Sequence, residues 1–277
     1  MKVSNLLQKL NLKGVGIKLG TWTPWMRHAF SNFSNWIVPG HVMLGRYPYV
    51  EPAHCHSKLE GEQQMAMLIS AGITTFVSLQ EELPPQHALR SSGANGFLPY
   101  KATAELLWHN NVAGHHSRQQ VTSISSAGTG HLDIIGDNRE EELGIVIERP
   151  TTIHHQPLPN IIEREMSEES QRGLRFIHAP IVDLGILSTE DLRSLLVQLT
   201  DLILMKREKL YIHCWGGCGR AGMVGTALLV TAYSVPVEEA LERVQRGFYT
   251  RNGKSHKTCP ETAEQFQFLR QFLLDYN

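Results

Sequence analysis

The amino-terminal part of this sequence has no acidic residue before Glu51, whereas six Lys and Arg residues precede that position. An acid-free basic start is typical of organelle transit peptides. The first 26 residues, however, contain no Arg and little Ser, which disfavours that interpretation. We therefore expect a cytoplasmic protein, with organelle targeting by the basic amino terminus as the alternative.

Cysteine and long hydrophobic runs are also scarce. The four cysteines, Cys55, Cys214, Cys218 and Cys259, are irregularly spaced, which excludes the disulfide framework of a small secreted domain and favours a reducing compartment. The longest weakly polar run, residues 221–233, is too short to cross a bilayer, so we expect no integral membrane span. A formal net charge of −1 gives no electrostatic reason to expect nucleic acid as a partner.

The chain is long enough for one large domain. We interpret residues 1–36 as an extension and residues 37–277 as the domain. Residues 109–172 break its pattern, because they contain six His, a Ser/Gly-rich run and an acidic cluster; we expect a long flexible insertion there. The six His lack regular ligand spacing and have no Cys near them, so we predict no metal site.

Strand and helix patterns alternate through the rest of the chain. Such alternation predicts an α/β fold with a largely parallel central sheet flanked by helices. A helix is expected to open at Ser188, since Ser188 and Asp191 form an S-x-x-D cap. A strand followed by a turn is predicted over residues 41–49, and further strands over residues 73–79, 174–181 and 210–213. Helices are predicted over residues 59–71, 188–204, 219–233, 237–246 and 261–274.

One stretch has an unusual composition: a cysteine ends a predicted strand, five residues form a loop, and an arginine opens a helix. Three glycines in the loop permit the close backbone approach that a ring of inward-pointing amides needs. The helix amino terminus adds partial positive charge at the same place. We therefore expect the loop to bind the phosphate of a substrate through Trp215, Gly216, Gly217, Cys218 and Gly219.

The two residues that flank this loop are the candidate catalytic residues. The positive field that binds phosphate also stabilises a thiolate, which makes Cys214 the candidate nucleophile. Arg220 can hold two phosphate oxygens with its planar guanidinium group. The alternative, a buried Cys in a tight turn beside a surface Arg, is disfavoured because three glycines weaken a turn that only has to be stable.

The pattern His213-Cys214-x-x-Gly217-x-x-Arg220 resembles the signature loop of the protein tyrosine phosphatase superfamily, and it is closest to the dual-specificity branch. The resemblance implies a protein tyrosine phosphatase-like fold and a phosphorylated protein as substrate. It implies hydrolysis of phosphotyrosine, and of phosphoserine or phosphothreonine as well, through a phosphocysteine intermediate on Cys214, without metal or cofactor. The chain has no Lys-Asn-Arg-Tyr-type loop, which favours dual specificity over strict tyrosine specificity.

The resemblance also implies a proton donor, because family members use an Asp about thirty residues before the nucleophile. Asp183 lies 31 residues before Cys214, just after a predicted strand and before Gly185, which suits a hinged loop. Asp191 is already a helix cap and Asp201 lies within a helix. We therefore expect Asp183 to donate the proton to the leaving oxygen.

One position departs from the family pattern. Family members usually have Ser or Thr directly after the Arg, and its hydroxyl assists the cysteine as a leaving group, whereas this chain has Ala221. A lost hydrogen bond to a charged group is worth about 1.5–3 kcal/mol, so a catalytically weak phosphate-binding module is one alternative function. A phosphoinositide or RNA 5′-triphosphate phosphatase is another, disfavoured because the loop contains no basic residue besides Arg220.

Cys218 lies within the same loop, four residues after Cys214. It could trap an oxidised Cys214 as a disulfide. A small residue that simply fits the loop is the simpler interpretation.

Overall fold

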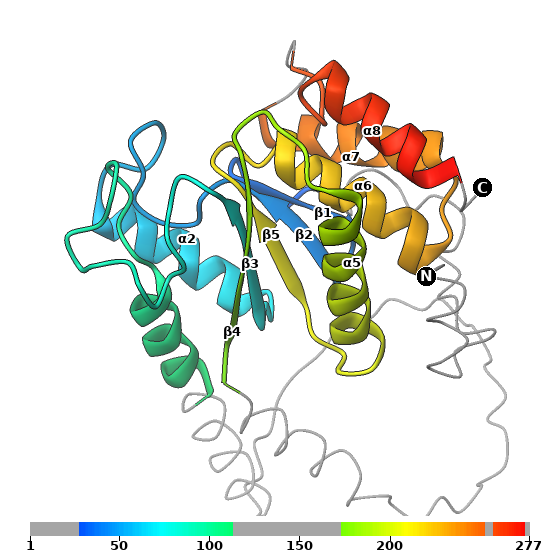
Figure 1. Ribbon diagram of the computed structural model, residues 1–277. Coiled ribbons are helices and arrows are strands. Elements are labelled where there is room, and N and C mark those ends of the chain that lie inside the picture. The colour runs from blue at the N-terminus through cyan, green and yellow to red at the C-terminus, as the bar shows by residue number, and fades with distance from the viewer. Residues whose placement is uncertain (1–27, 113–172, 253–256, 275–277) are drawn as a thin grey trace, which may run out of the picture. The chain divides into compact units, whose positions relative to one another are not determined.

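A computed structural model of the chain describes residues 28–112, 173–252 and 257–274 (Figure 1). The chain divides into two compact units, one formed by residues 1–109 with 173–277 and the other by residues 110–172. Of the flexible insertion predicted at residues 109–172, all but the first four residues lie outside the described part. So does the basic start of the chain, on which the targeting alternative depends.

A five-stranded sheet forms the centre of the first unit, with the strand order β1-β2-β5-β3-β4 (Figure 1). β1 pairs with β2 antiparallel, and every other neighbouring pair is parallel. The prediction of an α/β fold with a largely parallel sheet is thereby confirmed. The strands are β1 (Ser34–Val38), β2 (Val42–Gly45), β3 (Thr75–Gln80), β4 (Arg175–Ile181) and β5 (Leu210–His213).

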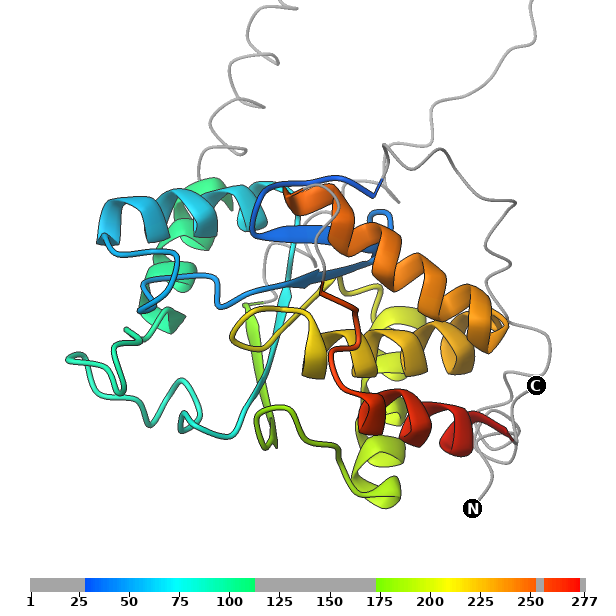
Figure 2. The same ribbon diagram turned by 90° about the horizontal axis from the view of Figure 1, so that it is seen from above.

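Helices cover both faces of the sheet, because successive side chains of a strand point to opposite sides. Val42 and Leu44 join the hydrophobic core on one face, whereas Met43 between them joins the core on the other. Figures 1 and 2 show α2 and a helix over residues 101–112 on one side, and the remaining helices on the other. The labelled helices are α2 (Lys58–Ser70), α5 (Thr189–Leu204), α6 (Gly219–Tyr233), α7 (Val237–Asn252) and α8 (Ala263–Leu273).

α5 and α6 differ in how their amino-terminal ends are capped. The Ser188 side chain accepts a hydrogen bond from the Asp191 amide and so caps α5, as the sequence predicts. No side chain caps α6, which leaves the amides of its first turn without a side-chain acceptor. Such an end is suited to an external anion. Among the described residues, no helix is long and apolar enough to cross a membrane.

Three elements differ from the sequence prediction. The helix over residues 101–112 was not predicted. β1 begins at Ser34, so the predicted boundary between the extension and the domain at residue 37 falls inside a core strand. The helix predicted to end at Arg246 continues to Asn252 through Gly247. A side chain at Gly247 would come within 2.4 Å of Asn35 Nδ2, so the glycine serves close packing of α7 on β1 rather than helix termination.

The parallel strands bring three chain segments to one edge of the sheet. Ser78 of β3 lies opposite His213 of β5, and Gln80 of β3 lies opposite Ile181 of β4. The segments that follow β3, β4 and β5 therefore emerge next to one another. In open α/β sheets, ligands bind at this carboxyl edge.

Candidate active site

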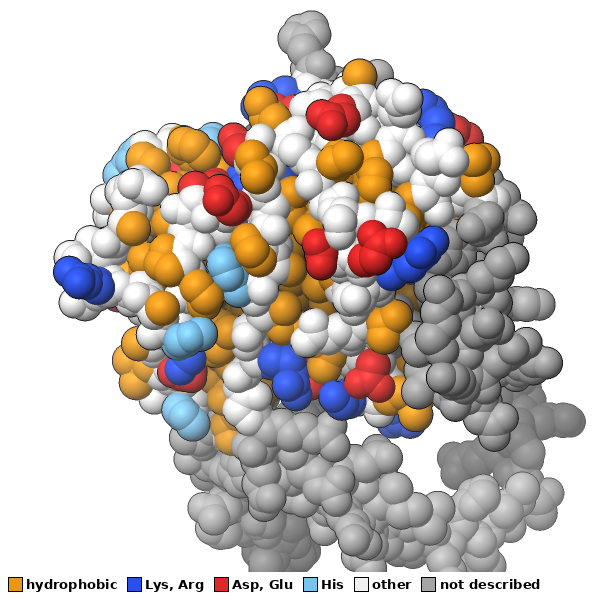
Figure 3. All heavy atoms as spheres, in the orientation of Figure 1, with side chains coloured by type: hydrophobic (Ala, Val, Ile, Leu, Met, Phe, Trp, Pro, Cys, Tyr) orange, Lys and Arg blue, Asp and Glu red, His pale blue; other side chains and the backbone are white. Residues whose placement is uncertain are grey.

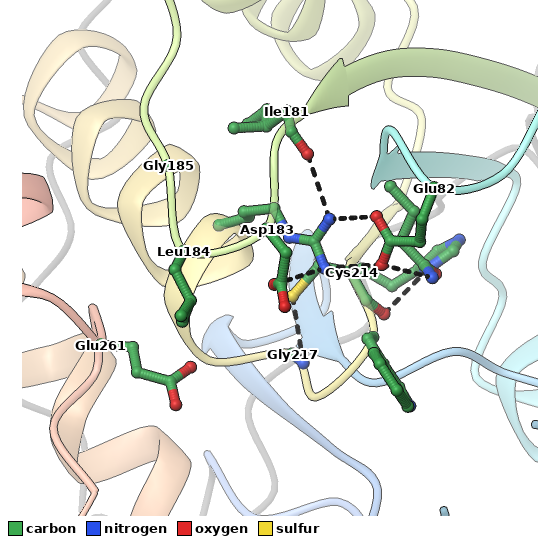
Figure 4. Close-up of polar contacts among 12 residues, drawn as sticks. Glu82, Ile181, Asp183, Leu184, Gly185, Cys214, Gly217 and Glu261 are labelled. Carbon is green, nitrogen blue, oxygen red and sulfur yellow. Dashed lines mark hydrogen bonds and ion pairs between the residues drawn. The ribbon is translucent and has the colours of Figure 1, made fainter. Parts of the chain in front are cut away.

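Cys214 follows β5 directly and begins the loop that leads into α6 (Figure 4). Its side chain is buried, and its sulfur accepts a hydrogen bond from the Gly217 amide at 3.2 Å. Gly217 has a φ of 68°, and a Cβ there would lie 2.2 Å from the carbonyl carbon and oxygen of Gly45. Only glycine allows this approach to β2, so the loop curls back and directs an amide at the sulfur.

Arg220, in the first turn of α6, has a side chain that is only 2% exposed. It donates hydrogen bonds to both carboxylate oxygens of Glu82, at 2.6 and 2.9 Å, and to the carbonyl oxygen of Ile181 at 3.1 Å (Figure 4). Burial opposes the charged forms of both side chains, but the bonds between them prevail: the pKa of Glu82 is lowered and that of Arg220 is raised. The guanidinium group is therefore fixed and charged beside Cys214.

Asp183 reaches the same guanidinium group from the loop after β4. Its Oδ1 lies 2.9 Å from Arg220 Nη2, and its side chain is 57% exposed. Leu184 adopts a φ of 60°, which turns the chain sharply after Asp183. Gln265 of α8 donates to the carbonyl oxygen of Gly185 at 3.0 Å, so α8 supports the loop from behind. The structure thus brings together Cys214, Arg220 and Asp183, which lie on three separate elements.

His213 lies fully buried under the loop. Its Nε2 and the hydroxyl of buried Tyr100 are 2.8 Å apart, and its Nδ1 lies 3.4 Å from the Cys214 carbonyl oxygen. Burial lowers the pKa of His213 to about 3. The imidazole is therefore neutral near neutral pH and fixes the direction of the Cys214 carbonyl without adding charge.

Trp215 presents an aromatic surface beside the loop. Its Nε1 donates to Glu51 Oε2 at 3.0 Å, and the ring of Phe97 packs edge-on against it at 5.4 Å between centroids. Glu51 is buried and also accepts from the Ala53 amide at 2.7 Å. The indole is therefore held in one orientation while 36% of the residue stays exposed.

The other loop residues have different surroundings. A Cβ added at Gly216 would meet nothing within 4 Å, so that position faces open space. The thiol of buried Cys218 donates to the Thr258 carbonyl oxygen at 3.0 Å. The sulfurs of Cys218 and Cys214 therefore have different hydrogen-bond partners. A Cβ at Gly219 would lie 3.2 Å from the Cβ of Glu261, whose carboxylate also appears in Figure 4.

Glu82 is the site residue that the sequence does not identify. It lies two residues after β3, and its role follows only from the parallel pairing of β3 with β5, which places it next to Arg220. No group of three His, Cys, Asp or Glu side chains that could hold a metal occurs in the described part of the chain.

Comparison with protein-family models matches residues 139–233 to a family described as a polymorphic toxin system DSP-PTPase phosphatase. The match contains Asp183, Cys214 and Arg220, the residues that meet at the carboxyl edge. The matched residues, which are fewer than half of the chain, are similar to the cysteine-based protein tyrosine phosphatase superfamily. The description of the family points to the dual-specificity branch of that superfamily. The match begins at residue 139, inside the segment predicted as an insertion.

Several solved phosphatase structures are similar to this chain. Tk-PTP in its active form is 19% identical, covering 86% of this chain and 95% of that chain, with a TM-score of 0.42. PTPMT1 in complex with PI(5)P is 13% identical, with coverages of 88% and 96% and a TM-score of 0.44. The human tyrosine phosphatase-like serine/threonine/tyrosine-interacting protein is 13% identical, with coverages of 87% and 95% and a TM-score of 0.42. A search of curated proteins finds no match.

Proposed function

We propose that the domain predicted at residues 37–277, extended at its start to include all of β1, is a protein phosphatase that hydrolyses phosphotyrosine, with phosphoserine and phosphothreonine as further substrates. We also propose that residues 109–172 are an insertion in this domain. The observation that supports the proposal most directly is the hydrogen bond from the Gly217 amide to the Cys214 sulfur, next to the buried guanidinium of Arg220. That environment favours a thiolate and a phosphate dianion at the same place.

In the proposed first step, the Cys214 thiolate attacks phosphorus while the bond to the leaving oxygen breaks. Asp183 transfers its proton to that oxygen, and a phosphocysteine forms. Arg220 and the loop amides hold the three remaining oxygens of the phosphoryl group, where negative charge gathers. The side chain of Trp215 contacts the substrate group that bears the phosphate.

In the proposed second step, water attacks the phosphocysteine and the phosphorus–sulfur bond breaks. Asp183, now a carboxylate, accepts a proton from that water, and Cys214 leaves as a thiolate. Inorganic phosphate is released, and both residues return to their starting states. Neither step requires a metal or a cofactor.

Hydrolysis of p-nitrophenyl phosphate between pH 5 and pH 7 tests the nucleophile. We expect the Cys214→Ser variant to lose turnover, because a hydroxyl does not ionise in this field as a thiol does. Cys55→Ser is the matched control, since the Cys55 thiol bonds to the Ser57 carbonyl oxygen away from the loop. Substantial turnover by Cys214→Ser would exclude Cys214 as the nucleophile.

A second candidate function is a phosphate-binding module with little turnover, and Ala221 is the observation that favours it. Ala221 is buried in the first turn of α6 and offers no hydroxyl to the departing sulfur. Rapid-mixing kinetics separate the two functions. We expect a burst of p-nitrophenol followed by slow turnover, and a faster second phase in Ala221→Ser; absence of the burst together with tight phosphate binding would favour the module.

A phosphoinositide phosphatase is disfavoured by the charges at the site. Two carboxylates, Glu82 and Asp183, already contact Arg220, and they would repel the additional phosphates of such a lipid. Acidic side chains also lie among hydrophobic ones over the upper part of the face shown in Figure 3, toward the carboxyl ends of the strands. Turnover of phosphopeptides and phosphoinositides, measured side by side, tests this preference.

A further inference from the structure

Around Arg220, negative charge exceeds positive charge, which is unfavourable for a site that binds an anion. One guanidinium group is contacted by two carboxylates, those of Glu82 and Asp183. Its charge is therefore neutralised before any ligand arrives. A thiolate on Cys214 and a phosphate dianion would then add further negative charge at a largely buried place, which is unfavourable unless a second cation lies close by.

Arg251, in the last turn of α7, lies on the other side of the same loop. It is buried, its Nε donates to Asn35 Oδ1 at 2.7 Å, and its Nη1 donates to the Gly216 carbonyl oxygen at 3.4 Å. Its guanidinium carbon lies 5.2 Å from the centre of the Phe248 ring. Within the described ranges, its Nη2 has no hydrogen-bond partner and no carboxylate pairs with it.

A buried cation without a carboxylate is costly and calls for a compensating anion. The carboxyl end of α7 supplies part of the compensation through its helix dipole. Burial lowers the pKa of Arg251, and the groups that oppose this effect are Cys259, Tyr211, Cys218 and Cys214. Arginine stays protonated in proteins, so the positive charge persists next to three thiols.

The peptide unit between Gly216 and Gly217 links this cation to the nucleophile. In a trans peptide the carbonyl and the N–H point in opposite directions. The Gly216 carbonyl oxygen accepts from Arg251, and the Gly217 amide of the same unit donates to the Cys214 sulfur. A bond that holds the oxygen on the α7 side therefore directs the N–H into the loop.

We propose that Arg251 is a positioning residue of the phosphate loop, which orients the peptide unit between Gly216 and Gly217 and supplies the unpaired positive charge that the Cys214 thiolate and the phosphate need. This inference rests on the proposed role of Cys214. The two guanidinium groups then have different roles. Arg220 contacts the phosphate directly, whereas Arg251 acts on it through the peptide unit between Gly216 and Gly217 and through its positive charge.

The test depends on which groups around Cys214 are charged near neutral pH. Near neutral pH, Tyr211 and Cys259 are neutral because burial raises the pKa of each, and His213 is neutral because burial lowers its pKa. Among the described residues, the charged groups around the loop include Arg220 with its two carboxylates, Arg251, the buried Arg46 next to Tyr211, and Glu51, which accepts from Trp215. Alkylation of Cys214 by iodoacetamide, followed by mass spectrometry from pH 4.5 to pH 8, reports the thiolate without requiring turnover.

In Arg251→Met we expect Cys214 to be alkylated about tenfold more slowly below pH 6, because the thiolate loses a cation. We expect inorganic phosphate to protect Cys214 half-maximally at about tenfold higher concentration. Arg251→Lys, which keeps the charge, should stay within about threefold of the unmodified protein in both measurements. Asn35→Asp, which places a carboxylate beside an intact Arg251, should slow alkylation as Arg251→Met does.

An Arg251→Met protein that unfolds cooperatively and keeps the unmodified pH dependence of alkylation and phosphate protection would overturn the proposal. If that variant fails to fold, Asn35→Asp decides, and an unchanged alkylation profile in it would overturn the proposal equally. A protein that shows the expected shifts but hydrolyses no substrate would support the role of Arg251 and contradict the proposed phosphatase function.

Discussion

Arg220 is shared between two carboxylates that differ in mobility. Glu82 bonds to two of its nitrogens from the end of a core strand, whereas exposed Asp183 contacts one nitrogen from a loop. A phosphate that binds Arg220 can replace Asp183 as acceptor without disturbing Glu82. In the proposed mechanism, this would release Asp183 next to the leaving oxygen, where a proton donor is needed.

For Asp183→Asn we expect a slower first chemical step and the loss of the decline in rate at high pH, since the variant has no proton to lose there. The effect should be about 10²–10⁴-fold on phosphoserine peptides, whose alkoxide leaves poorly, and smaller on aryl phosphates. Rate profiles against pH with both substrates measure it. A variant that keeps a bell-shaped profile and near-normal rates on phosphoserine would show that another carboxylate is the acid.

His213 makes stability depend on pH. Burial lowers its pKa to about 3 in the folded protein, against about 6.5 in an unfolded chain. The unfolded chain therefore binds the proton more readily, so the stabilising contribution is complete above pH 6.5 and is lost as the pH falls towards 3. At pH 5 the loss amounts to about 2 kcal/mol.

Urea denaturation of His213→Asn should accordingly show a weaker fall in the free energy of unfolding between pH 7 and pH 5 than the unmodified protein. The two proteins are compared by how steeply the free energy of unfolding changes with pH, and not by its absolute value, because the variant also loses the bond to Tyr100. Parallel pH dependences of the two proteins would mean that other groups determine the acid sensitivity.

At the scale of elements, the packing of the phosphate loop on β2 depends on one glycine. We expect Gly217→Ala to lower the free energy of unfolding by about 1–3 kcal/mol and to abolish hydrolysis, because a Cβ would collide with Gly45 at a positive φ. Gly216→Ala is the matched control, since open space surrounds that position. Chemical denaturation and p-nitrophenyl phosphate turnover of both variants test the difference, and equal losses would contradict it.

The loop and its flanking elements were predictable because their sequence signals are local. β5 and α6 have the predicted bounds, Leu210–His213 and Gly219–Tyr233, since a short buried strand, three glycines and an apolar helix follow one another. β1 was missed because Ser34–Val38 is short and buried throughout, so it has no alternating pattern. Sequence reasoning also ended a helix before Gly247, which hid the position of Arg251 within α7.

The site itself was only partly predictable for a similar reason. Asp183 could be found by its spacing from Cys214, although its contact with Arg220 required the structure. Glu82 and Arg251 have no motif of their own. Each reaches the loop through tertiary packing, Glu82 through the pairing of β3 with β5 and Arg251 through the packing of α7 on β1.

At the scale of the whole molecule, the proposed insertion, residues 109–172, includes all of the second compact unit, residues 110–172. We expect a protein in which a short Gly/Ser linker replaces residues 115–165 to unfold cooperatively and to hydrolyse p-nitrophenyl phosphate, because surface insertions add little to core stability. Thermal denaturation and turnover measure this.

A second deletion, of residues 115–138, serves as the control because it spares every residue of the family match. If only this shorter deletion is folded and active, residues 139–165 belong to the catalytic domain and the proposed boundaries are too wide.

The pairing of β3 with β4 joins strands that are separated by residues 81–174. β4 is an edge strand, and several of its side chains are only partly buried. Contacts between such distant parts of a chain form late during folding, and edge elements open first under native conditions. A molecule in which β4 has detached would retain Cys214 and Arg220 on β5 and α6 but would lack Asp183. The proposed catalytic activity would then be lost through local opening well before the core unfolds.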